Sequence, residues 1–209
     1  MCTGHPTVCA SSTEYLEYKL WEEGYRLIGG VDEAGRGPLA GPLVASCVVL
    51  SPSFPLTHVP DAKRLTPARR RKLFEVICRE AVCVTLGIVG EQFVDRLGIQ
   101  RANAFALYEA AWRASSLGRY EYLIVDWFPI TWSFTPCLSL PHGEERSLAV
   151  ACASVVAKVF RDYLMETWYD ALFPEYGFAQ HKGYGTAEHF ERLRVLGPSP
   201  CHRKSFCRG

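Results

Sequence analysis

Two apolar segments joined by a turn rich in glycine and proline limit the possible folds more than any other feature of this sequence. The first segment, residues 27–32, runs directly into DEAGRGPLAGP at 32–42, where glycine and proline mark a tight turn. The second segment, LVASCVVL at 43–50, is rich in residues that favour strands. The pattern predicts two strands in succession, the second of them mostly buried.

The later apolar patterns predict an α/β domain. Helices are expected at residues 12–23, from Thr66-Pro67 onward, at 99–117 and from 147 to about 171; strands are expected at 82–89 and 121–126. Because three strands come first and helices then alternate with a strand, we expect a mixed sheet whose first strands form an antiparallel meander. Residues 1–11 are expected to be a flexible tail ahead of a single domain, residues 12–209.

A last short helix is predicted near the carboxyl end. Thr186 offers a capping hydroxyl, and Gly197 stands where the helix is expected to end. The spacing of Phe190, Leu193 and Leu196 predicts that these three side chains face inward.

Charge is distributed unevenly along a chain whose formal net charge is only +1. Basic residues occur in three runs: Lys63-Arg64 with residues 69–72, His181-Lys182, and residues 202–204 with Arg208. Each run has two interpretations, a solvated face or part of a local phosphate-binding face. The second is compatible with a near-neutral protein, because binding depends on the cations at the contact rather than on the total.

The cysteines indicate a reduced, cytoplasmic protein. Their number, nine, is odd, no two have the spacing CxxC, and no segment resembles a signal peptide. Four of them, at positions 47, 78, 83 and 152, lie within apolar segments, where a free thiol behaves as a small hydrophobic group. The longest apolar runs are too short to cross a bilayer, so we expect no membrane association.

Acidic residues stand at the ends of two predicted strands. Asp32 and Glu33 end the first, and Asp126 ends the strand at 121–126. Ligands gather beyond the carboxyl ends of strands in such folds, so these acids are expected to converge. Carboxylates brought together repel one another unless a cation neutralises them, and a set without His or thiolate suits Mg²⁺ or Mn²⁺. The competing interpretation is a solvated acidic turn and an unrelated acid at a strand end.

Adjacent positions on a strand raise a geometric difficulty. Consecutive side chains point to opposite faces, so Asp32 and Glu33 are not expected to reach the same site from a regular strand. We therefore expect either that the strand breaks here or that Glu33 contributes its backbone carbonyl.

Several motifs in series carry a resemblance to a known family. GVDEAGRGPLAGP (30–42) is similar to the first motif of ribonuclease HII, and it is followed in order by DAKRLTPARR (61–70), YLIVD (122–126), ASVVAKVFRD (153–162), YGFAQHKGYGT (176–186) and HRKSF (202–206). The resemblance covers about residues 20–208.

The resemblance implies a ribonuclease H-like fold, with a central mixed five-stranded sheet flanked by helices and a helical C-terminal part. It implies that Asp32, Glu33 and Asp126 bind two divalent ions, Mn²⁺ or Mg²⁺. It also implies that Gly35, Arg36 and Gly37 read the RNA–DNA junction. The expected activity is endonucleolytic cleavage of the RNA strand of RNA–DNA hybrids, and of duplex DNA on the 5′ side of single ribonucleotides, leaving 3′-hydroxyl and 5′-phosphate ends. A monomer is expected.

Three positions depart from the family's pattern, and one of them, Gly98 in place of a common asparagine, carries no functional prediction. The fourth acid is usually aspartate; an ungapped count places Glu144 there, with Glu145 as a competitor, whereas Asp162 is expected to form ion pairs within a helix. Trp127 follows the third acid, where the family usually has glycine. Packing is the favoured interpretation of its indole, and stacking on a sugar is the alternative.

The resemblance implies weaker contacts elsewhere. Tyr184 resembles the tyrosine that stacks on the deoxyribose after the ribonucleotide, and Tyr176 is the alternative. His181 and His202 are expected to be hydrogen-bonded loop residues rather than metal ligands. Candidates for phosphate contacts are Lys63, Arg64, Lys182 and Arg203.

Two other functions remain as alternatives at this stage. A ribonuclease HIII has similar acids, but it typically carries an extra N-terminal domain and lacks the Gly-Arg-Gly form. A non-catalytic hybrid-binding protein is the other, and the three acids at the strand ends argue against it.

Overall fold

The computed structural model describes residues 15–128 and 135–207. Its elements follow the order α1 (Leu16–Glu22), β1 (Ile28–Ala34), β2 (Leu43–Leu50), α2 (Pro67–Glu80), β3 (Cys83–Val89), α3 (Glu91–Leu97), α4 (Ile99–Ser116), β4 (Tyr122–Asp126), β5 (Cys137–Leu140), α5 (Gly143–Arg146), α6 (Leu148–Leu164), the π-helical segment η1 (Met165–Tyr169), α7 (Asp170–Leu172), the short 3-10 segment η2 (Pro174–Tyr176), α8 (Phe178–His181) and α9 (Ala187–Leu196). The predicted tail at 1–11, the start of the helix predicted at 12–23, and Arg208 lie outside the described residues.

The five strands form one mixed sheet in the order β3-β2-β1-β4-β5. β1 pairs antiparallel with β2, and β2 with β3, which confirms the predicted meander. β1 pairs parallel with β4, and β4 with β5. The carboxyl ends of β1, β4 and β5 therefore meet at one edge of the sheet.

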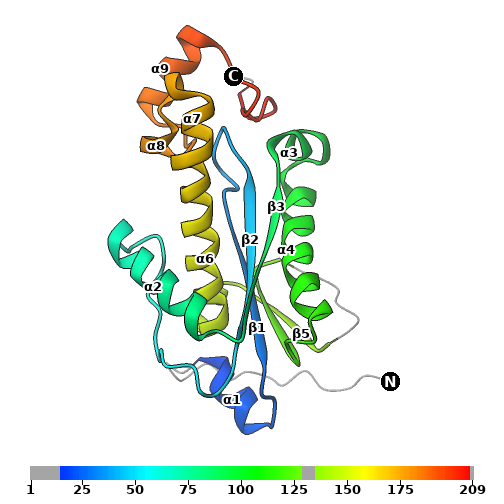
Figure 1. Ribbon diagram of the computed structural model, residues 1–209. Helices are drawn as coiled ribbons and strands as arrows, with labels where there is room; N and C mark the ends of the chain where they lie inside the picture. The colour runs from blue at the N-terminus through cyan, green and yellow to red at the C-terminus, as the bar shows by residue number, and fades with distance from the viewer. Residues whose placement is uncertain (1–14, 129–134, 208–209) are drawn as a thin grey trace.

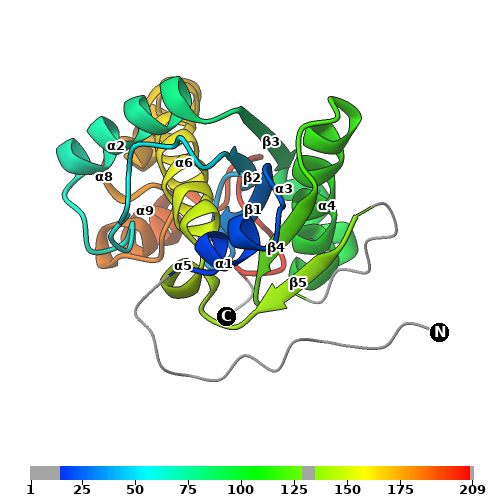
Figure 2. The same ribbon diagram turned by 90° about the horizontal axis from the view of Figure 1, so that it is seen from below.

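Helices cover both faces of the sheet. Figure 1 and Figure 2 show α4 with α3 on one side and α6 on the other, with α2 packed outside α6. Small side chains allow these helices to approach closely. A Cβ on Gly30 of β1 would lie 2.2 Å from the carbonyl carbon of Ala149 in α6, so the strand and the helix touch through their backbones.

Local signals predicted several helix ends correctly. Thr66 caps α2 by accepting a hydrogen bond from the Arg69 N–H, with Pro67 in the first turn, and Thr186 caps α9 in the same way. The helix expected from 147 to about 171 is interrupted by the π-helical segment at Met165–Tyr169. Five elements, α3, β5, α5, η2 and α8, had no individual prediction.

The predicted inner face of α9 is only partly correct. Leu193 packs against the core of the C-terminal part, but Phe190 and Leu196 are 55% and 49% exposed. The buried residue of this helix is His189, whose ring hydrogen-bonds His202 at 2.9 Å. The spacing of apolar residues predicted the wrong buried face, because α9 packs against a polar cluster that contains His189 and His202.

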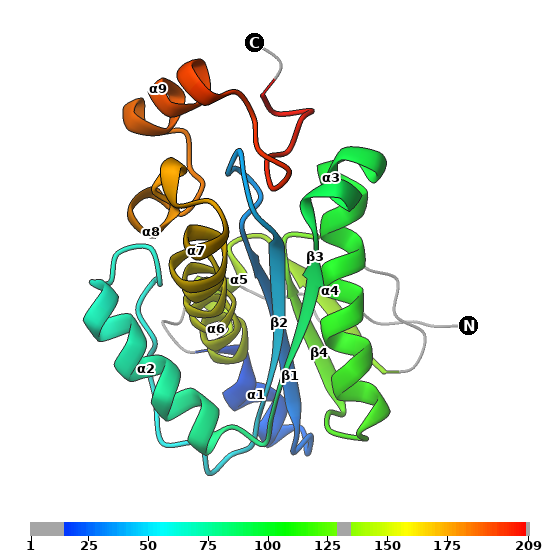
Figure 3. The ribbon, with the colours of Figure 1, turned by 45° about the horizontal axis from the view of Figure 1, so that its top comes forward.

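The C-terminal part closes one end of the sheet. Figure 3 shows α7, α8, α9 and the final coil gathered around the loop that joins β1 to β2. Backbone hydrogen bonds tie this loop to the coil, from the Gly41 N–H to the Cys201 carbonyl and from the Arg203 N–H to the Leu39 carbonyl. The expected five-stranded sheet and helical C-terminal part are both present.

The described residues also show the state of the cysteines and the character of the helices. All seven cysteines within the described ranges are free thiols. Among the helices at 15–128 and 135–207, none combines the length and the apolar character needed to cross a bilayer.

Candidate active site

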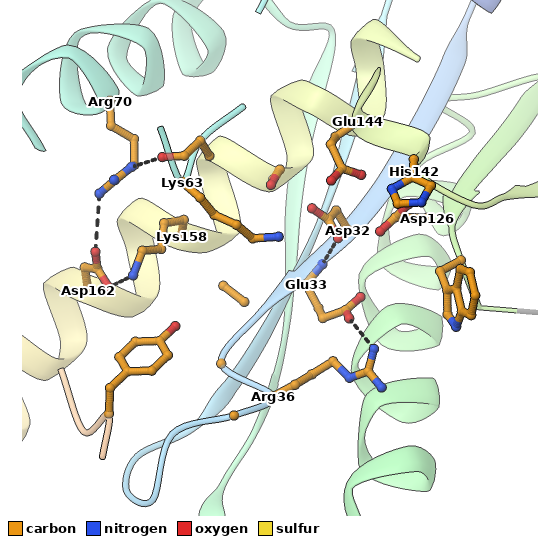
Figure 4. A pocket seen from close by; sticks show the side chains of 17 residues that line it. Asp32, Glu33, Arg36, Lys63, Arg70, Asp126, His142, Glu144, Lys158 and Asp162 are labelled. Atoms are coloured by element: carbon orange, nitrogen blue, oxygen red, sulfur yellow. Dashed lines mark hydrogen bonds and ion pairs between the residues drawn. The ribbon is translucent and has the colours of Figure 1, made fainter. Parts of the chain in front are cut away.

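The acids at the ends of β1 and β4 share one cleft. The parallel ladder of β1 and β4 ends at the pair Val31 and Val125, so Asp32 and Asp126 are the next residues on neighbouring strands. Both line a cleft of about 760 Å³, together with Glu33 and Glu144 (Figure 4). The sheet register alone thus brings together two acids that lie far apart in the sequence.

Glu33 lines the cleft without a break in the strand, so of the two alternatives the strand break is wrong. β1 remains regular to Ala34, with Glu33 paired to Ala45 of β2. Beyond Val31, however, β1 no longer pairs with β4, and the consecutive residues Asp32 and Glu33 both line the cleft. The Glu33 N–H donates to Oδ1 of Asp32 at 2.7 Å, and its carboxylate pairs with Arg36 at 3.4 Å.

Glu144 comes from α5, which follows β5. The Gly143 N–H donates to Oδ1 of Asp126 at 2.6 Å and so ties α5 to the end of β4. Oε2 of Glu144 is buried and has no hydrogen-bond partner. Glu145, the competitor, is exposed and does not line the cleft.

Burial and mutual repulsion raise the pKa values of three of these acids. Burial raises the pKa of Asp32 well above its usual value, and the carboxylates of Glu33 and Asp126 raise it further. Burial also raises the pKa of Glu33, against the lowering effect of Arg36. For Asp126, burial raises the pKa, whereas the Gly143 N–H and Lys63 lower it. Such a site favours a bound cation, because a cation removes the repulsion.

The donor set fits a hard divalent cation. All four acids offer carboxylate oxygens, His142 is the one imidazole in the lining beside them, no thiolate lines the cleft, and one buried oxygen of Glu144 has no hydrogen-bond partner. Within residues 15–128 and 135–207, no three acidic, His or Cys side chains already converge on one point closely enough to hold an ion. The acids line the same cleft, but their side chains would have to adopt other rotamers to bind one ion together.

The loop after β1 is held by buried arginines. Gly35 has φ +98°, and a Cβ there would lie 2.3 Å from Nε of Arg161, which itself donates to the Pro42 and Ala40 carbonyls. Arg203, predicted to contact phosphate, is fully buried instead and donates to the carbonyls of Gly41 and Arg36. The predicted phosphate contact of Arg203 was therefore wrong, because its guanidinium is buried and used by the loop. A guanidinium has several fixed donors, which suit a chain segment rich in carbonyls and poor in side chains.

Gly37 differs from Gly35 because nothing lies within 4 Å of the position of a Cβ. Its φ lies outside the positive range, so neither packing nor backbone conformation requires glycine there. Gly35, Arg36 and Gly37 all line the cleft. The space at Gly37 is open to a ligand.

The three remaining basic candidates lie in different environments. Lys63 lines the cleft. Arg64 is exposed, pairs with Asp61 at 3.6 Å, and lies outside the cleft. Lys182 also lies outside it, and its ammonium group pairs with Glu166 at 3.1 Å.

The two candidate tyrosines are clearly different. Tyr184 lines the cleft, with the ammonium group of Lys158 5.2 Å from its ring centroid. Tyr176 is buried, stacks on Phe178 and donates its hydroxyl to the Gly197 carbonyl. Tyr184 is therefore the only one of the two that can face a ligand in the cleft.

Other sequence expectations concern Asp162, the two histidines and Trp127. Asp162 forms ion pairs with Lys158 at 2.7 Å and Arg70 at 3.5 Å, as predicted. His181 and His202 are buried and hydrogen-bonded as predicted, but His181 ends helix α8 and does not lie in a loop. The favoured interpretation of Trp127 was wrong, because this residue lines the cleft and is 64% exposed.

Sequence reasoning did not single out three polar residues of the cleft, His142, Ser154 and Lys158. Lys158 stands in the motif ASVVAKVFRD, which could have indicated it. His142 had no such signal, because it belongs to a short connection between β5 and α5 that no apolar pattern marks.

A five-stranded mixed sheet, covered by helices and carrying acids at the ends of two parallel strands, places the chain in the class of ribonuclease H-like folds. Solved structures agree. The RNase HII in the PCNA:RNase HII complex from Archaeoglobus fulgidus matches with a TM-score of 0.67 at 22% identity, covering 85% of this chain and 93% of that one. Bst-RNase HIII in complex with Mn²⁺ matches with a TM-score of 0.68 at 18% identity, covering 87% and 67%. At such identities the likeness concerns the fold.

Sequence comparison identifies the family within this class. The family model for ribonuclease HII matches residues 29–209. The ribonuclease HII of Syntrophotalea carbinolica is 47% identical over 92% of this chain and 90% of its own length, and that of Geobacter sulfurreducens is 43% identical over 91% and 87%. The chain belongs to the ribonuclease HII family, and it is an endoribonuclease.

Proposed function

We propose that this chain hydrolyses the RNA strand of RNA–DNA hybrids and cuts duplex DNA on the 5′ side of single ribonucleotides. The products would carry 3′-hydroxyl and 5′-phosphate ends. The observation that carries the proposal is the cleft itself, in which Asp32, Glu33, Asp126 and Glu144 stand beside the open glycine loop at 35–37. Membership of the family supports the choice of substrate.

Two divalent ions, Mn²⁺ or Mg²⁺, would be held by Asp32, Glu33, Asp126 and Glu144. When bound, such ions lower the pKa of a water nucleophile and stabilise the leaving oxygen. The raised pKa values of Asp32, Glu33 and Asp126 support this assignment, because these acids gain most from a neighbouring cation. Bst-RNase HIII, a protein of the same fold, has been solved in complex with Mn²⁺, which also supports the choice of ion.

The glycine loop would test for the 2′-hydroxyl. This group both donates and accepts hydrogen bonds, and it distinguishes RNA from DNA at a single nucleotide. A backbone without side chains can present an N–H and a carbonyl to it at close range. The free space at Gly37 supports such an approach, and the buried Arg161 and Arg203 hold the loop in place. Tyr184 would stack on the following deoxyribose, and Lys63 would contact phosphate.

Of the other basic candidates, Arg64 and Lys182 would need to reach substrate from outside the cleft. We further propose that the protein works as a monomer in the cytoplasm. A ribonuclease HIII-like activity and a non-catalytic hybrid-binding role are the competing functions. The match to the ribonuclease HII model argues against the first, and the complete set of four acids argues against the second.

Digestion of a DNA duplex with one embedded ribonucleotide tests the proposal. With Mg²⁺ or Mn²⁺ we expect a single cut on the 5′ side of the ribonucleotide, mapped to the base, and no cut in an all-DNA duplex. Asp126→Asn should abolish cutting and keep the thermal unfolding transition. Cleavage of uniform hybrids only would favour the ribonuclease HIII-like activity, and binding without any metal-dependent cut would favour the non-catalytic role.

A further inference from the structure

Trp127 occupies a backbone position that suits glycine. Its φ is +51°, which is uncommon for any residue with a side chain and more so for a bulky one. Three hydrogen bonds enforce this conformation: from the Trp127 N–H to the Leu140 carbonyl at 2.7 Å, from the Phe128 N–H to the Asp126 carbonyl at 2.5 Å, and from the Ser139 hydroxyl to the Phe128 carbonyl at 2.8 Å. The turn would form more easily with glycine, so the indole has a conformational cost.

The core does not account for the presence of this indole. With 64% of its surface exposed, Trp127 contributes little to packing. It lines the acidic cleft directly after Asp126. A strained backbone that carries an exposed aromatic side chain at a catalytic cleft is a sign of a functional role, because such strain clusters at ligand contacts.

The cleft has an aromatic residue on each side of its acids, Tyr184 on one and Trp127 on the other. In Figure 4, Asp32 and Glu33 lie between Lys158 and Asp162 on one side and Asp126 and His142 on the other. Tyr184 belongs to the first side, because Lys158 lies over its ring at 5.2 Å. Trp127 belongs to the second, because it follows Asp126 in the chain.

We propose that Trp127 is a substrate-binding residue that stacks on the sugar of the nucleotide on the 5′ side of the cut. This inference rests on the proposed function, in which Tyr184 stacks on the deoxyribose that follows the ribonucleotide. A strand held by Tyr184 at that end passes the acids and reaches Trp127 at the other. Within a duplex the bases remain stacked, so the exposed face available to an indole there is that of a sugar ring. Two aromatic contacts would fix the scissile phosphate between them.

Binding measurements with Ca²⁺ in place of Mg²⁺, checked on a gel for the absence of cutting, test this contact directly. Three duplexes carry the same ribonucleotide and differ only at the position on its 5′ side. That position holds an intact nucleotide in the first duplex, an abasic sugar in the second, and a three-carbon linker without a sugar in the third. For the wild type we expect the abasic duplex to bind within about twofold of the intact one, and the linker duplex to bind roughly tenfold more weakly, which is the lower end of the range for a base stacked on an aromatic side chain.

Trp127→Gly should bind the intact duplex roughly tenfold more weakly, with no further loss on the linker duplex. Its melting temperature should stay within about 2 °C of the wild type, because glycine adopts this φ freely and the lost side chain is exposed. Trp127→Phe should keep most of the affinity. The matched control is Trp168→Ala, which removes an indole that is 63% exposed and does not line the cleft; it should bind as the wild type does.

Several results would overturn the inference. One is full affinity of Trp127→Gly for the intact duplex, and another is weaker binding of the linker duplex than of the intact one in that variant. In the wild type, an abasic duplex that bound as weakly as the linker duplex would show a contact with the base. A loss of affinity in Trp168→Ala comparable to that in Trp127→Gly would show that the effect is not specific to the cleft. Cleavage of the intact duplex with Mg²⁺ is measured in parallel. A wild type that binds with this pattern but makes no cut at the ribonucleotide would refute the proposed function and leave the Trp127 contact established.

Discussion

The contact between Gly30 and α6 offers a demanding test of how the fold holds the acids in place. A Cβ at Gly30 would lie 2.2 Å from the carbonyl carbon of Ala149, 2.3 Å from the Val150 nitrogen and 2.6 Å from the Ala149 Cβ. Non-bonded carbon atoms rest at roughly 3.5–4.0 Å, so Gly30→Ala requires β1 and α6 to separate by about 1 Å or more.

The start of α6 has little freedom to move away. Glu17 of α1 is fully buried and accepts hydrogen bonds from the Leu148 N–H at 3.0 Å and the Ala149 N–H at 2.9 Å. Overpacking costs roughly 1–3 kcal/mol, and two opposed backbones place this site at the upper end. At about 2–4 °C per kcal/mol for a chain of this size, we expect the melting temperature to fall by roughly 6–12 °C.

Activity should fall as well, because α6 follows α5, which carries Glu144 and binds Asp126. A displacement of about 1 Å in such a site costs on the order of 100-fold in kcat. The assays are thermal unfolding and cleavage kinetics on the duplex with one ribonucleotide. Gly90→Ala is the matched control, with no atom within 4 Å of the added Cβ and φ −68°; its stability should stay within about 1 kcal/mol. A Gly30→Ala variant that melts and cuts like the wild type would refute the reasoning.

Three further predictions concern the acids and the histidine cluster. Glu144→Gln should lower kcat at least 10-fold more than Glu145→Gln, because only Glu144 lines the cleft; the reverse ranking in cleavage assays would contradict the assignment of the fourth acid. Asp32→Asn should raise the free energy of unfolding in EDTA by roughly 1–3 kcal/mol, because it removes a buried charge that repels the neighbouring carboxylates. The same change should reduce the stabilisation of the protein by Mn²⁺. A lower free energy of unfolding in EDTA would count against this prediction. Burial lowers the pKa of His202 to about 4. The free energy of unfolding should therefore decrease as the pH falls from about 6.5 to about 4, by roughly 3 kcal/mol at the acid end. His202→Gln should flatten this dependence in denaturant titrations at several pH values, and an unchanged pH profile would exclude His202 as its source.

Much of the secondary structure could be predicted because its signals are local. The strand at 43–50 was predicted at its observed bounds, and the Thr66-Pro67 and Thr186 helix starts were correct. Strand-forming composition, caps and turn residues act over a few positions, so they can be read without knowing what packs nearby. The inner face of α9 failed for the converse reason, since it depends on the partner against which the helix packs.

The candidate site was predictable in its residue types but not in its geometry. The motifs pointed to Asp32, Glu33 and Asp126, yet neither the regular strand through Glu33 nor the burial of Arg203 could be seen in the sequence. Trp127 was misjudged because an aromatic residue in a short connection is compatible with either core or surface. Its exposure depends on a turn whose hydrogen bonds reach Ser139 and Leu140.

By itself, the sequence determined the family through its series of motifs. It also determined the order of the first four strands and the acids near the ends of two of them, because these depend on local composition and spacing. The tertiary structure decided that Glu144 rather than Glu145 enters the cleft, that Tyr184 rather than Tyr176 can face a ligand, and that Arg203 supports a loop. Those outcomes depend on pairings between segments up to 167 residues apart, as between Arg36 and Arg203. Such pairings follow from the packing of the whole domain, which no local pattern encodes.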